Sequence, residues 1–162
     1  MLPDQRIAVV WMANCDWIDS GPLNGPITYA ALDVALGLRP RPITLKRSLT
    51  RTLSFTFQRE GFGAALREYQ LLRRQHGDLY DFSDRQLNEF GTQLLNADHP
   101  HEAVEILSLN VKAHPSSAHA HERLAQAYMA DGNRPLAVIH YERAVKLDPT
   151  LVDSVRALES SR

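Results

Sequence analysis

The 162-residue sequence has little of several residue types that mark particular protein classes. It has one cysteine, Cys15, so the chain by itself can build neither a disulfide framework nor a metal site of several thiolates. No apolar run approaches the ~20 residues that a membrane-spanning helix needs, and the most apolar stretch, residues 7–13, is too short for a secretory signal. With 44% hydrophobic and 23% charged residues, the composition indicates a soluble folded protein. We expect it in the cytoplasm, or in the periplasm if it belongs to a longer exported protein.

The sequence also lacks a strong overall charge, because its formal net charge is −1, but the two signs are unevenly distributed. Residues 39–76 hold nine Lys and Arg against two Glu, a net charge of +7, whereas residues 1–38 and 77–162 sum to −3 and −5. A basic block of this kind binds phosphates of nucleic acid, or it docks on the chain's own acidic surfaces or on an acidic partner. We favour docking on an acidic protein surface, of this chain or of a partner, because the block shows no exposed aromatic residues interleaved among its cations and no nucleic-acid fold motif. Nucleic-acid binding is the alternative.

A period of 34 residues is present in the second half of the chain. Residues 84–117 align with residues 118–151 without a gap. The aligned pairs include Phe90 with Leu124, Gly91 with Ala125, Leu94 with Tyr128, Ala103 with Ala137, Leu107 with Tyr141 and Pro115 with Pro149. Small residues at fixed positions let two antiparallel helices approach closely, and a proline ends the second helix of each copy. The pattern therefore predicts two successive helical hairpins.

The second copy resembles the tetratricopeptide repeat (TPR) family. The family's Leu-Gly, Tyr, Ala, Phe, Ala and Pro positions are met here by Leu124-Ala125, Tyr128, Ala137, Tyr141, Ala144 and Pro149. The resemblance implies a mainly α fold, a TPR helical-hairpin solenoid, with TPR 1 at residues 84–117 and TPR 2 at residues 118–151. Residues 131–133 supply a glycine turn in the second copy, and residues 98–100 replace it by a stiffer turn in the first.

Weaker helical patterns flank the two repeats. Residues 45–83 predict a divergent helical hairpin, with a turn at residues 60–63 and a loop at residues 78–83. One of its helices has an apolar stripe at Leu45, Leu49, Leu53 and Phe57, and the other repeats the TPR spacing at Ala65, Tyr69 and Leu72. Residues 152–162, with Val155 and Leu158 after Leu151, predict a C-terminal capping helix that covers the end of the stack.

The first 44 residues form a strand–helix segment of a different kind. The β-branched run at residues 7–13 predicts a buried strand, residues 28–36 predict a helix ending at Gly37, and residues 39–42 predict a stiff linker. This order, over residues 3–44, is similar to the closing segment of the serine β-lactamase and penicillin-binding-like hydrolase family, some bacterial members of which continue into helical repeats. A lone strand needs partners that this sequence does not contain.

The chemistry of that hydrolase family is absent from the sequence. No serine has a lysine three residues later, and neither a Lys-Thr-Gly triplet nor a Gly-x-Ser-x-Gly motif occurs. Without a nucleophile and its base, the chain has no covalent catalysis of this type. We therefore expect no enzymatic activity of the chain alone. The alternative is that it is a C-terminal accessory fragment of a hydrolase whose catalytic motifs lie upstream.

We predict no metal site and no cofactor. His119 and His121 lie two residues apart on a predicted helix and so point to different sides, while His99 and His101 flank a proline in a turn. Within the repeat, His121 takes the place of an interface aromatic residue and His119 faces the groove. Cys15 lies beside Asp16, whose negative charge opposes thiolate formation, so we expect an inert thiol.

The concave side of the two repeats is the predicted functional surface. The first helix of each copy should line a groove that takes an extended peptide or a helix of a partner protein. The predicted groove residues are Arg85, Asn88, Thr92, Leu95, Asn96, His119, Glu122, Gln126 and Met129. Two other interpretations stay open, namely that these residues are only solvated, or that the groove holds another part of the same polypeptide.

Overall fold

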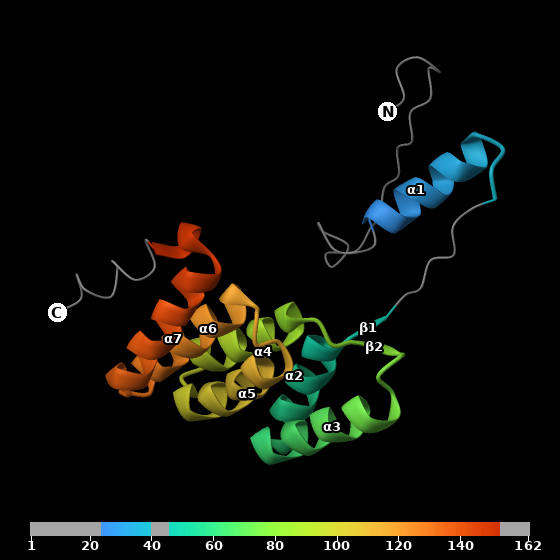
Figure 1. Ribbon diagram of the computed structural model, residues 1–162. Helices are drawn as coiled ribbons and strands as arrows, with labels where there is room; N and C mark the ends of the chain where they lie inside the picture. The colour runs from blue at the N-terminus through green and yellow to red at the C-terminus, as the bar shows by residue number, and fades with distance from the viewer. Residues whose placement is uncertain (1–23, 40–45, 153–162) are drawn as a thin grey trace. The chain divides into compact units, whose positions relative to one another are not determined.

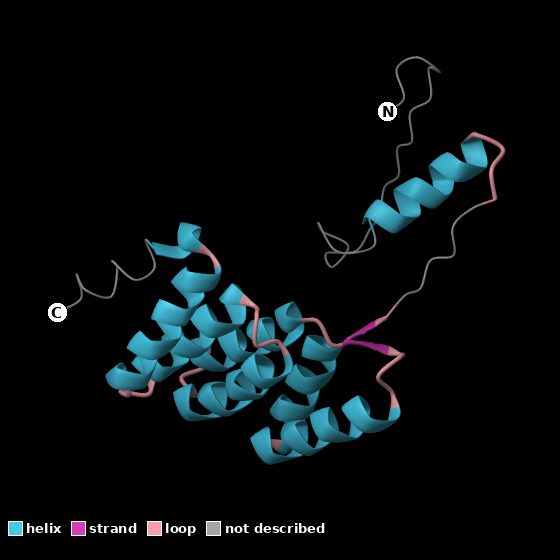
Figure 2. Ribbon diagram, in the orientation of Figure 1, coloured by secondary structure: helices cyan, strands magenta, loops and turns pink. Residues whose placement is uncertain are grey.

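The computed structural model describes residues 24–39 and 46–152, and the chain divides into two units, residues 1–45 and 46–162 (Figure 1). The described part is almost entirely helical, which confirms the predicted mainly α fold class (Figure 2). The predicted strand at residues 7–13 and residues 153–162 of the predicted capping helix lie outside the described residues.

One helix, α1 (Asn24–Ala35), is described in the first unit. It begins four residues earlier than predicted, because Gly25 and Pro26, interpreted as part of a loop, lie in its first turn. A proline fits there, since the first four N–H groups of a helix have no intrahelical acceptor. Gly37 follows the helix end as predicted, with φ of +71°, and Leu38 N–H donates to Asp33 O at 2.8 Å. This is the hydrogen bond of a Schellman helix end.

In the second unit, residues 46–152 form three helical hairpins. The six helices pack so that α2 contacts α3 and α4, α4 contacts α5 and α6, and α6 contacts α5 and α7. Their bounds are α2 Leu49–Glu60, α3 Phe62–Gln75, α4 Asp84–Asn96, α5 Pro100–Ala113, α6 Ala118–Ala130 and α7 Arg134–Leu147, followed by the short 3-10 helix η2 Pro149–Leu151.

The predicted 34-residue period recurs in the helix boundaries. The first helices of the two repeats, α4 and α6, begin at Asp84 and Ala118, and the second helices, α5 and α7, begin at Pro100 and Arg134. The small residues predicted at the closest helix contacts are fully covered, since Ala125 and Ala137 have 0% exposure. The period therefore describes a real repetition of the hairpin.

The turn inside each hairpin has the same backbone form although its residues differ. Gly132 has φ of +81°, and Asp98 at the aligned position has φ of +61°. In each turn the N–H of the following residue donates to a carbonyl oxygen five residues earlier, that of Tyr128 at 2.8 Å and that of Leu94 at 2.9 Å. Positive φ is unfavourable for residues with a Cβ and least so for Asp and Asn. The first repeat thus keeps the turn without glycine.

The divergent hairpin packs as its pattern predicts. Leu49 and Leu53 of α2 have 0% exposure, and Tyr69 and Leu72 of α3 are buried beside them. A single residue, Gly61, joins the two helices with φ of +81°. Leu45, the first residue of the predicted stripe, lies outside the described residues.

A two-residue parallel pairing joins this hairpin to the first repeat. One side lies in the predicted loop, and the other lies where the sequence predicts a helix that starts at Leu45, whereas α2 begins only at Leu49. β1 (Arg47–Ser48) pairs with β2 (Tyr80–Asp81). Next to it, Gln86 of α4 caps α2, because its Oε1 accepts from Thr50 N–H and from the Ser48 hydroxyl, both at 3.0 Å. The starts of α2 and α4 are thereby held together.

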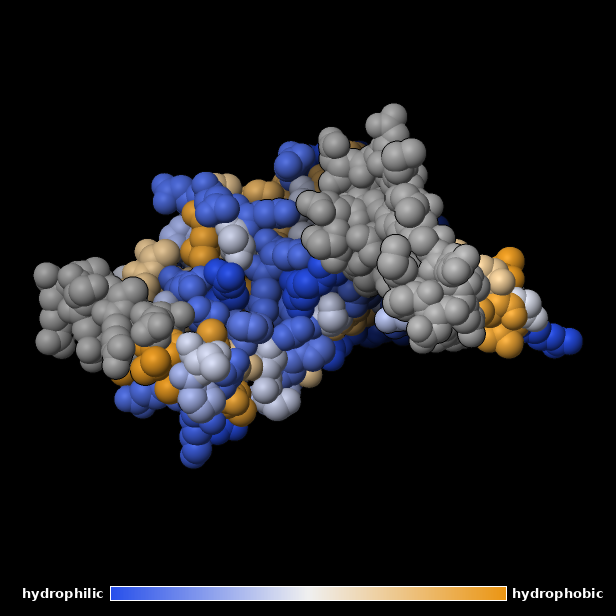
Figure 3. All heavy atoms as spheres, turned by 90° about the horizontal axis from the view of Figure 1, so that it is seen from above, coloured by the Kyte–Doolittle hydropathy of each residue, from blue (hydrophilic) through white to orange (hydrophobic). Residues whose placement is uncertain are grey.

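The surface of the described residues is mixed in character. In the view of Figure 3, hydrophilic residues cover much of the visible face and hydrophobic ones gather in separate patches. Among the described residues, no helix combines the length and the apolar composition that crossing a bilayer requires.

Candidate peptide-binding site

The predicted groove residues lie on α4 and α6, two helices that pack against each other. Three of them are exposed: Arg85, with half of its side chain exposed, Asn96, and His119, with 66% of its side chain exposed. Arg85 forms an ion pair with Glu89 one turn later at 3.5 Å. Since exposed pairs of this kind contribute little to stability, these side chains can turn towards a ligand at low cost.

Four more of the predicted residues are half-buried: Thr92, Leu95, Gln126 and Met129. The Thr92 hydroxyl donates to the Asn88 carbonyl at 2.8 Å, and Gln126 Oε1 accepts from Arg123 Nη1 at 2.9 Å. Leu95 and Met129 pack partly against the apolar core. These two side chains offer apolar contact area, and the amide of Gln126 keeps its NH₂ group as a donor.

The remaining two predicted residues, Asn88 and Glu122, are each only 8% exposed. Asn88 turns its side-chain oxygen inward, where it accepts from Asn110 Nδ2 at 2.8 Å. Glu122 Oε2 lies 3.5 Å from His119 Nδ1. Glu122 can therefore orient His119, whereas the side-chain oxygen of Asn88 is used in a hydrogen bond inside the protein.

The sequence prediction did not include Asn110, the centre of a polar cluster beneath this surface. Asn110 has 0% exposure, and its Nδ2 also donates to the Asp84 carbonyl at 2.8 Å. The Ser117 hydroxyl donates to the Asp84 carboxylate and caps α6 by accepting from Ala120 N–H at 3.1 Å. One signal was available, because Asn110 aligns with Ala144, so a polar residue stands where the repeat has a small one.

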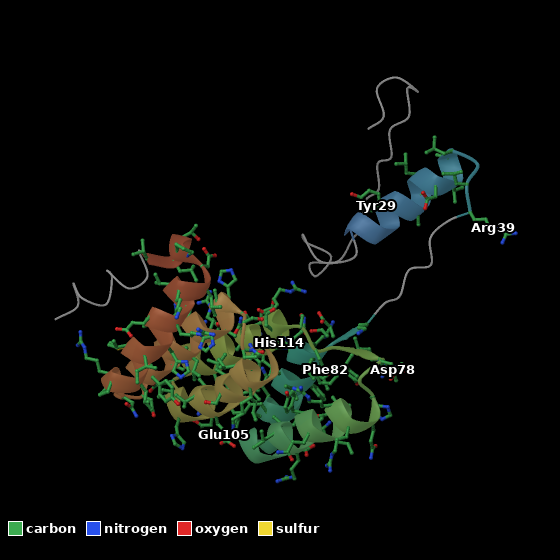
Figure 4. All side chains as sticks on the ribbon, in the orientation of Figure 1. Tyr29, Arg39, Asp78, Phe82, Glu105 and His114 are labelled. Atoms are coloured by element: carbon green, nitrogen blue, oxygen red, sulfur yellow. The ribbon has the colours of Figure 1, made fainter. Side chains whose placement is uncertain are left out.

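A further polar contact closes the same end of the first repeat. His114, just after α5, donates from Nε2 to the carbonyl oxygen of Phe82 at 2.9 Å, and the two residues are labelled in Figure 4. Together with the Asn110 cluster, it ties α5 to the segment that enters α4. The start of α4 is thus fixed by hydrogen bonds from α5, from the residue after α5 and from the start of α6.

The two helical hairpins are in register, approach closely at small residues and are each followed by a proline. Residues 118–151 match the family model of the tetratricopeptide repeat. The match coincides with α6, α7 and the turn after them, and residues 84–117 repeat its helix boundaries 34 residues earlier. No curated protein matches the chain. The resemblance of residues 3–44 to a serine hydrolase has no support from these comparisons.

Within the matched residues 118–151, His121 and His140 form a hydrogen-bonded pair. Their Nδ1 atoms lie 3.0 Å apart, and His121 Nε2 lies 3.2 Å from the carbonyl oxygen of Pro115. Since a carbonyl only accepts, His121 carries its proton on Nε2, and His140 donates from Nδ1 to the free Nδ1 of His121. The Tyr128 ring lies 5.6 Å from the His140 ring. His121 thus occupies an interface position, as predicted, with 7% exposure.

The surroundings of both imidazoles favour the neutral form. Burial is the main cause that lowers the pKa of His121 below 6.5; the hydrogen bond to the Pro115 carbonyl opposes it, and the positive charge of Arg143 adds to it. Burial also lowers the pKa of His140, and His121 lowers it further. If both imidazoles were charged, His121 Nδ1 would also carry a proton. This would break the Nδ1–H···Nδ1 bond and place two like charges in contact.

We expect the stability of the chain to fall as the pH is lowered through 6.5. The unfolded chain takes up protons on both imidazoles near that pH, whereas the folded chain resists protonation until lower pH, so acid favours unfolding. Urea unfolding between pH 8 and 5 should show this slope, and His140→Gln should flatten it. His101→Gln, with 84% of the His101 side chain exposed, is the matched control. Equal slopes for His140→Gln and the wild type would contradict the assignment.

No metal-binding arrangement occurs among residues 24–39 and 46–152, where no three His, Cys, Asp or Glu side chains come together. His99 and His101 have separate partners: His99 Nδ1 lies 3.2 Å from Glu102, and His101 Nδ1 lies 3.8 Å from Asp131. Cys15 lies outside the described residues.

The basic block departs from its sequence interpretation in one respect. The prediction was that no aromatic residue is exposed among its cations, and this is wrong for Phe55, which is 58% exposed. The Arg59 guanidinium lies over the Phe55 ring, 5.2 Å from its centroid. Phe55 is missed because the apolar stripe of α2 predicts only which residues face inward.

Proposed function

We propose that the chain is a protein-interaction scaffold whose α4 and α6 surface binds an extended peptide or a helix of a partner protein. The observation that carries this proposal is the tetratricopeptide repeat match at residues 118–151, since such repeats generally bind proteins and are not generally catalysts. The proposal extends the function to TPR 1 at residues 84–117 and treats the hairpin within residues 45–83 as part of the same scaffold.

The exposed polar groups of the two helices support this choice. Arg85, Asn96 and His119 are exposed, and the amide of Gln126 keeps an N–H₂ group that can donate to a peptide carbonyl. Leu95 and Met129 add apolar contact beside them. A peptide backbone needs this combination of hydrogen-bonding groups and adaptable apolar side chains.

The proposal is tested by selecting peptides from a random 12-residue display library on the full chain. Selected peptides should bind the wild type, and a variant with Arg85→Glu, Asn96→Ala and His119→Ala should weaken binding by at least about tenfold. Fluorescence anisotropy with labelled peptides measures the change. Because all three residues are exposed, the variant should keep the helical content of the wild type.

The matched control is Glu105→Lys, which changes an exposed charge on α5 (Figure 4). It should leave the affinity for the selected peptides within about twofold. A library that yields no binding peptide, or peptides that bind the triple variant as tightly as the wild type, would overturn the proposal.

A further inference from the structure

A hollow lies between α2 and α3, on the side of the hairpin away from α4. The contacts of α2 to α4 come from Thr50, Ser54 and Phe57, which share one face of the helix. The hollow uses the opposite face of α2, because residues 52, 55 and 59 lie about half a turn from those three. It is lined by Thr52, Phe55, Thr56, Arg59, Glu60, Ala64, Arg67, Glu68 and Leu71, which we call the end face.

The end face exposes large apolar side chains. Phe55 on α2 is 58% exposed and Leu71 on α3 is 43% exposed, and both line the hollow. Burial of such side chains stabilises a protein, so leaving two of them exposed beside each other indicates a surface that a partner covers. A groove between two antiparallel helices accepts the side-chain ridge of a third helix.

The segment that carries the end face is basic, although the hollow itself is lined by two Arg and two Glu. Residues 46–77 carry seven Lys and Arg against two Glu, whereas residues 78–152 carry six against eleven Asp and Glu. Both Glu of the basic segment already have partners, since Glu60 lies 3.7 Å from Arg59 and Glu68 accepts from the Thr56 hydroxyl. Arg67 lines the same hollow and is exposed.

We propose that the end face binds an acidic amphipathic helix of a partner protein. Apolar residues of that helix contact Phe55 and Leu71, and its carboxylates pair with Arg59 and Arg67. A protein helix fits better than nucleic acid, because Phe55 and Leu71 offer apolar contacts that a phosphate backbone does not use, and Arg59 already covers one face of the Phe55 ring on which a base would stack. This site is separate from the α4 and α6 surface, so the two proposals stand or fall independently.

The probe is a fluorescein-labelled 18-residue peptide of Leu, Ala and Glu, with Leu at helical spacing on one face and Glu on the other. It should bind the full chain in an anisotropy titration. Phe55→Ser and Arg67→Glu should each weaken binding by at least about tenfold, while a peptide with Lys in place of Glu should not bind. Failure of the acidic peptide to bind at about millimolar concentration overturns the proposal.

Matched controls lie elsewhere on the molecule. Ile139→Ser removes an equally exposed apolar residue on α7, and Lys112→Glu reverses an exposed charge on α5. Both should bind the peptide within about twofold of the wild type. Circular dichroism checks that all four variants keep their helices, and the Arg85, Asn96 and His119 variant should bind the acidic peptide normally.

The same variants distinguish the acidic helix from two other possible occupants of the end face, nucleic acid and a second copy of the chain. Tighter binding of a single-stranded oligonucleotide, unaffected by Phe55→Ser, would assign the surface to nucleic acid and overturn the proposal. Sedimentation that shows a self-associated wild type, a monomeric Phe55→Ser variant and no peptide binding would assign the surface to a second copy of the chain, and would overturn it as well.

Discussion

An Asn110→Asp variant is expected to lose about 3–5 kcal/mol of unfolding free energy, a large part of the roughly 5–15 kcal/mol of a typical domain. The Asn110 Nδ2 donates to two acceptors, the Asp84 carbonyl and Asn88 Oδ1, each at 2.8 Å. A carboxylate would put oxygen against oxygen at both contacts. It would also carry a charge at a position with 0% exposure and no cation in the cluster.

The Asn110→Ala variant separates the charge from the lost hydrogen bonds. Alanine is the residue at the aligned position, Ala144, so the space tolerates it in the neighbouring repeat. Its cost should be about 1–3 kcal/mol, because Asp84 O and Asn88 Oδ1 lose a donor. Urea unfolding followed by circular dichroism measures both variants at pH 7. An Asn110→Asp variant no less stable than Asn110→Ala would show that the buried charge is compensated and that this account is wrong.

The repeat itself could be predicted from the sequence because its signals are local and periodic. Small residues at Ala125 and Ala137, apolar residues at helical spacing and a proline after each second helix occur twice at the same interval. Helix boundaries follow from such patterns. The turn at Asp98 shows what such patterns do not predict. Its positive φ is imposed by the hairpin geometry, and the sequence has no glycine there that would indicate it.

Contacts between elements distant in sequence could not be predicted. The β1–β2 pairing involves two residues on each side, too few for any periodicity, and it exists because α2 and α4 begin next to each other. The inward turn of Asn88 depends on Asn110, a residue on another helix. The exposure of Phe55 depends on which side of α2 lies against α4. Each of these is a property of the packed hairpins and leaves no pattern in its own segment.

The contact of α4 with α5 at Gly91 gives the second large effect. A Cβ at Gly91 of α4 would lie 2.5–2.7 Å from three side-chain carbons of Leu107 on α5. Leu107 has 0% exposure, so it cannot move aside without disturbing the core. We expect Gly91→Ala to destabilise the chain by about 1–3 kcal/mol, although alanine in a helix interior is otherwise favoured by about 0.5–1 kcal/mol. Leu107→Ala should cost about 2–5 kcal/mol by leaving a cavity.

The double variant Gly91→Ala with Leu107→Ala tests whether these two side chains share one space. The alanine methyl at position 91 then enters volume that the shortened residue 107 has vacated, and the helix propensity of alanine is gained without the clash. The loss in unfolding free energy should therefore be smaller than the sum of the two single losses by at least about 1 kcal/mol. The second repeat already has alanine at this place, since Ala125 packs with Ala137 and the ring of Tyr141. Additive losses would mean that the clash is relieved elsewhere, and that the glycine is not required by the approach of α4 to α5.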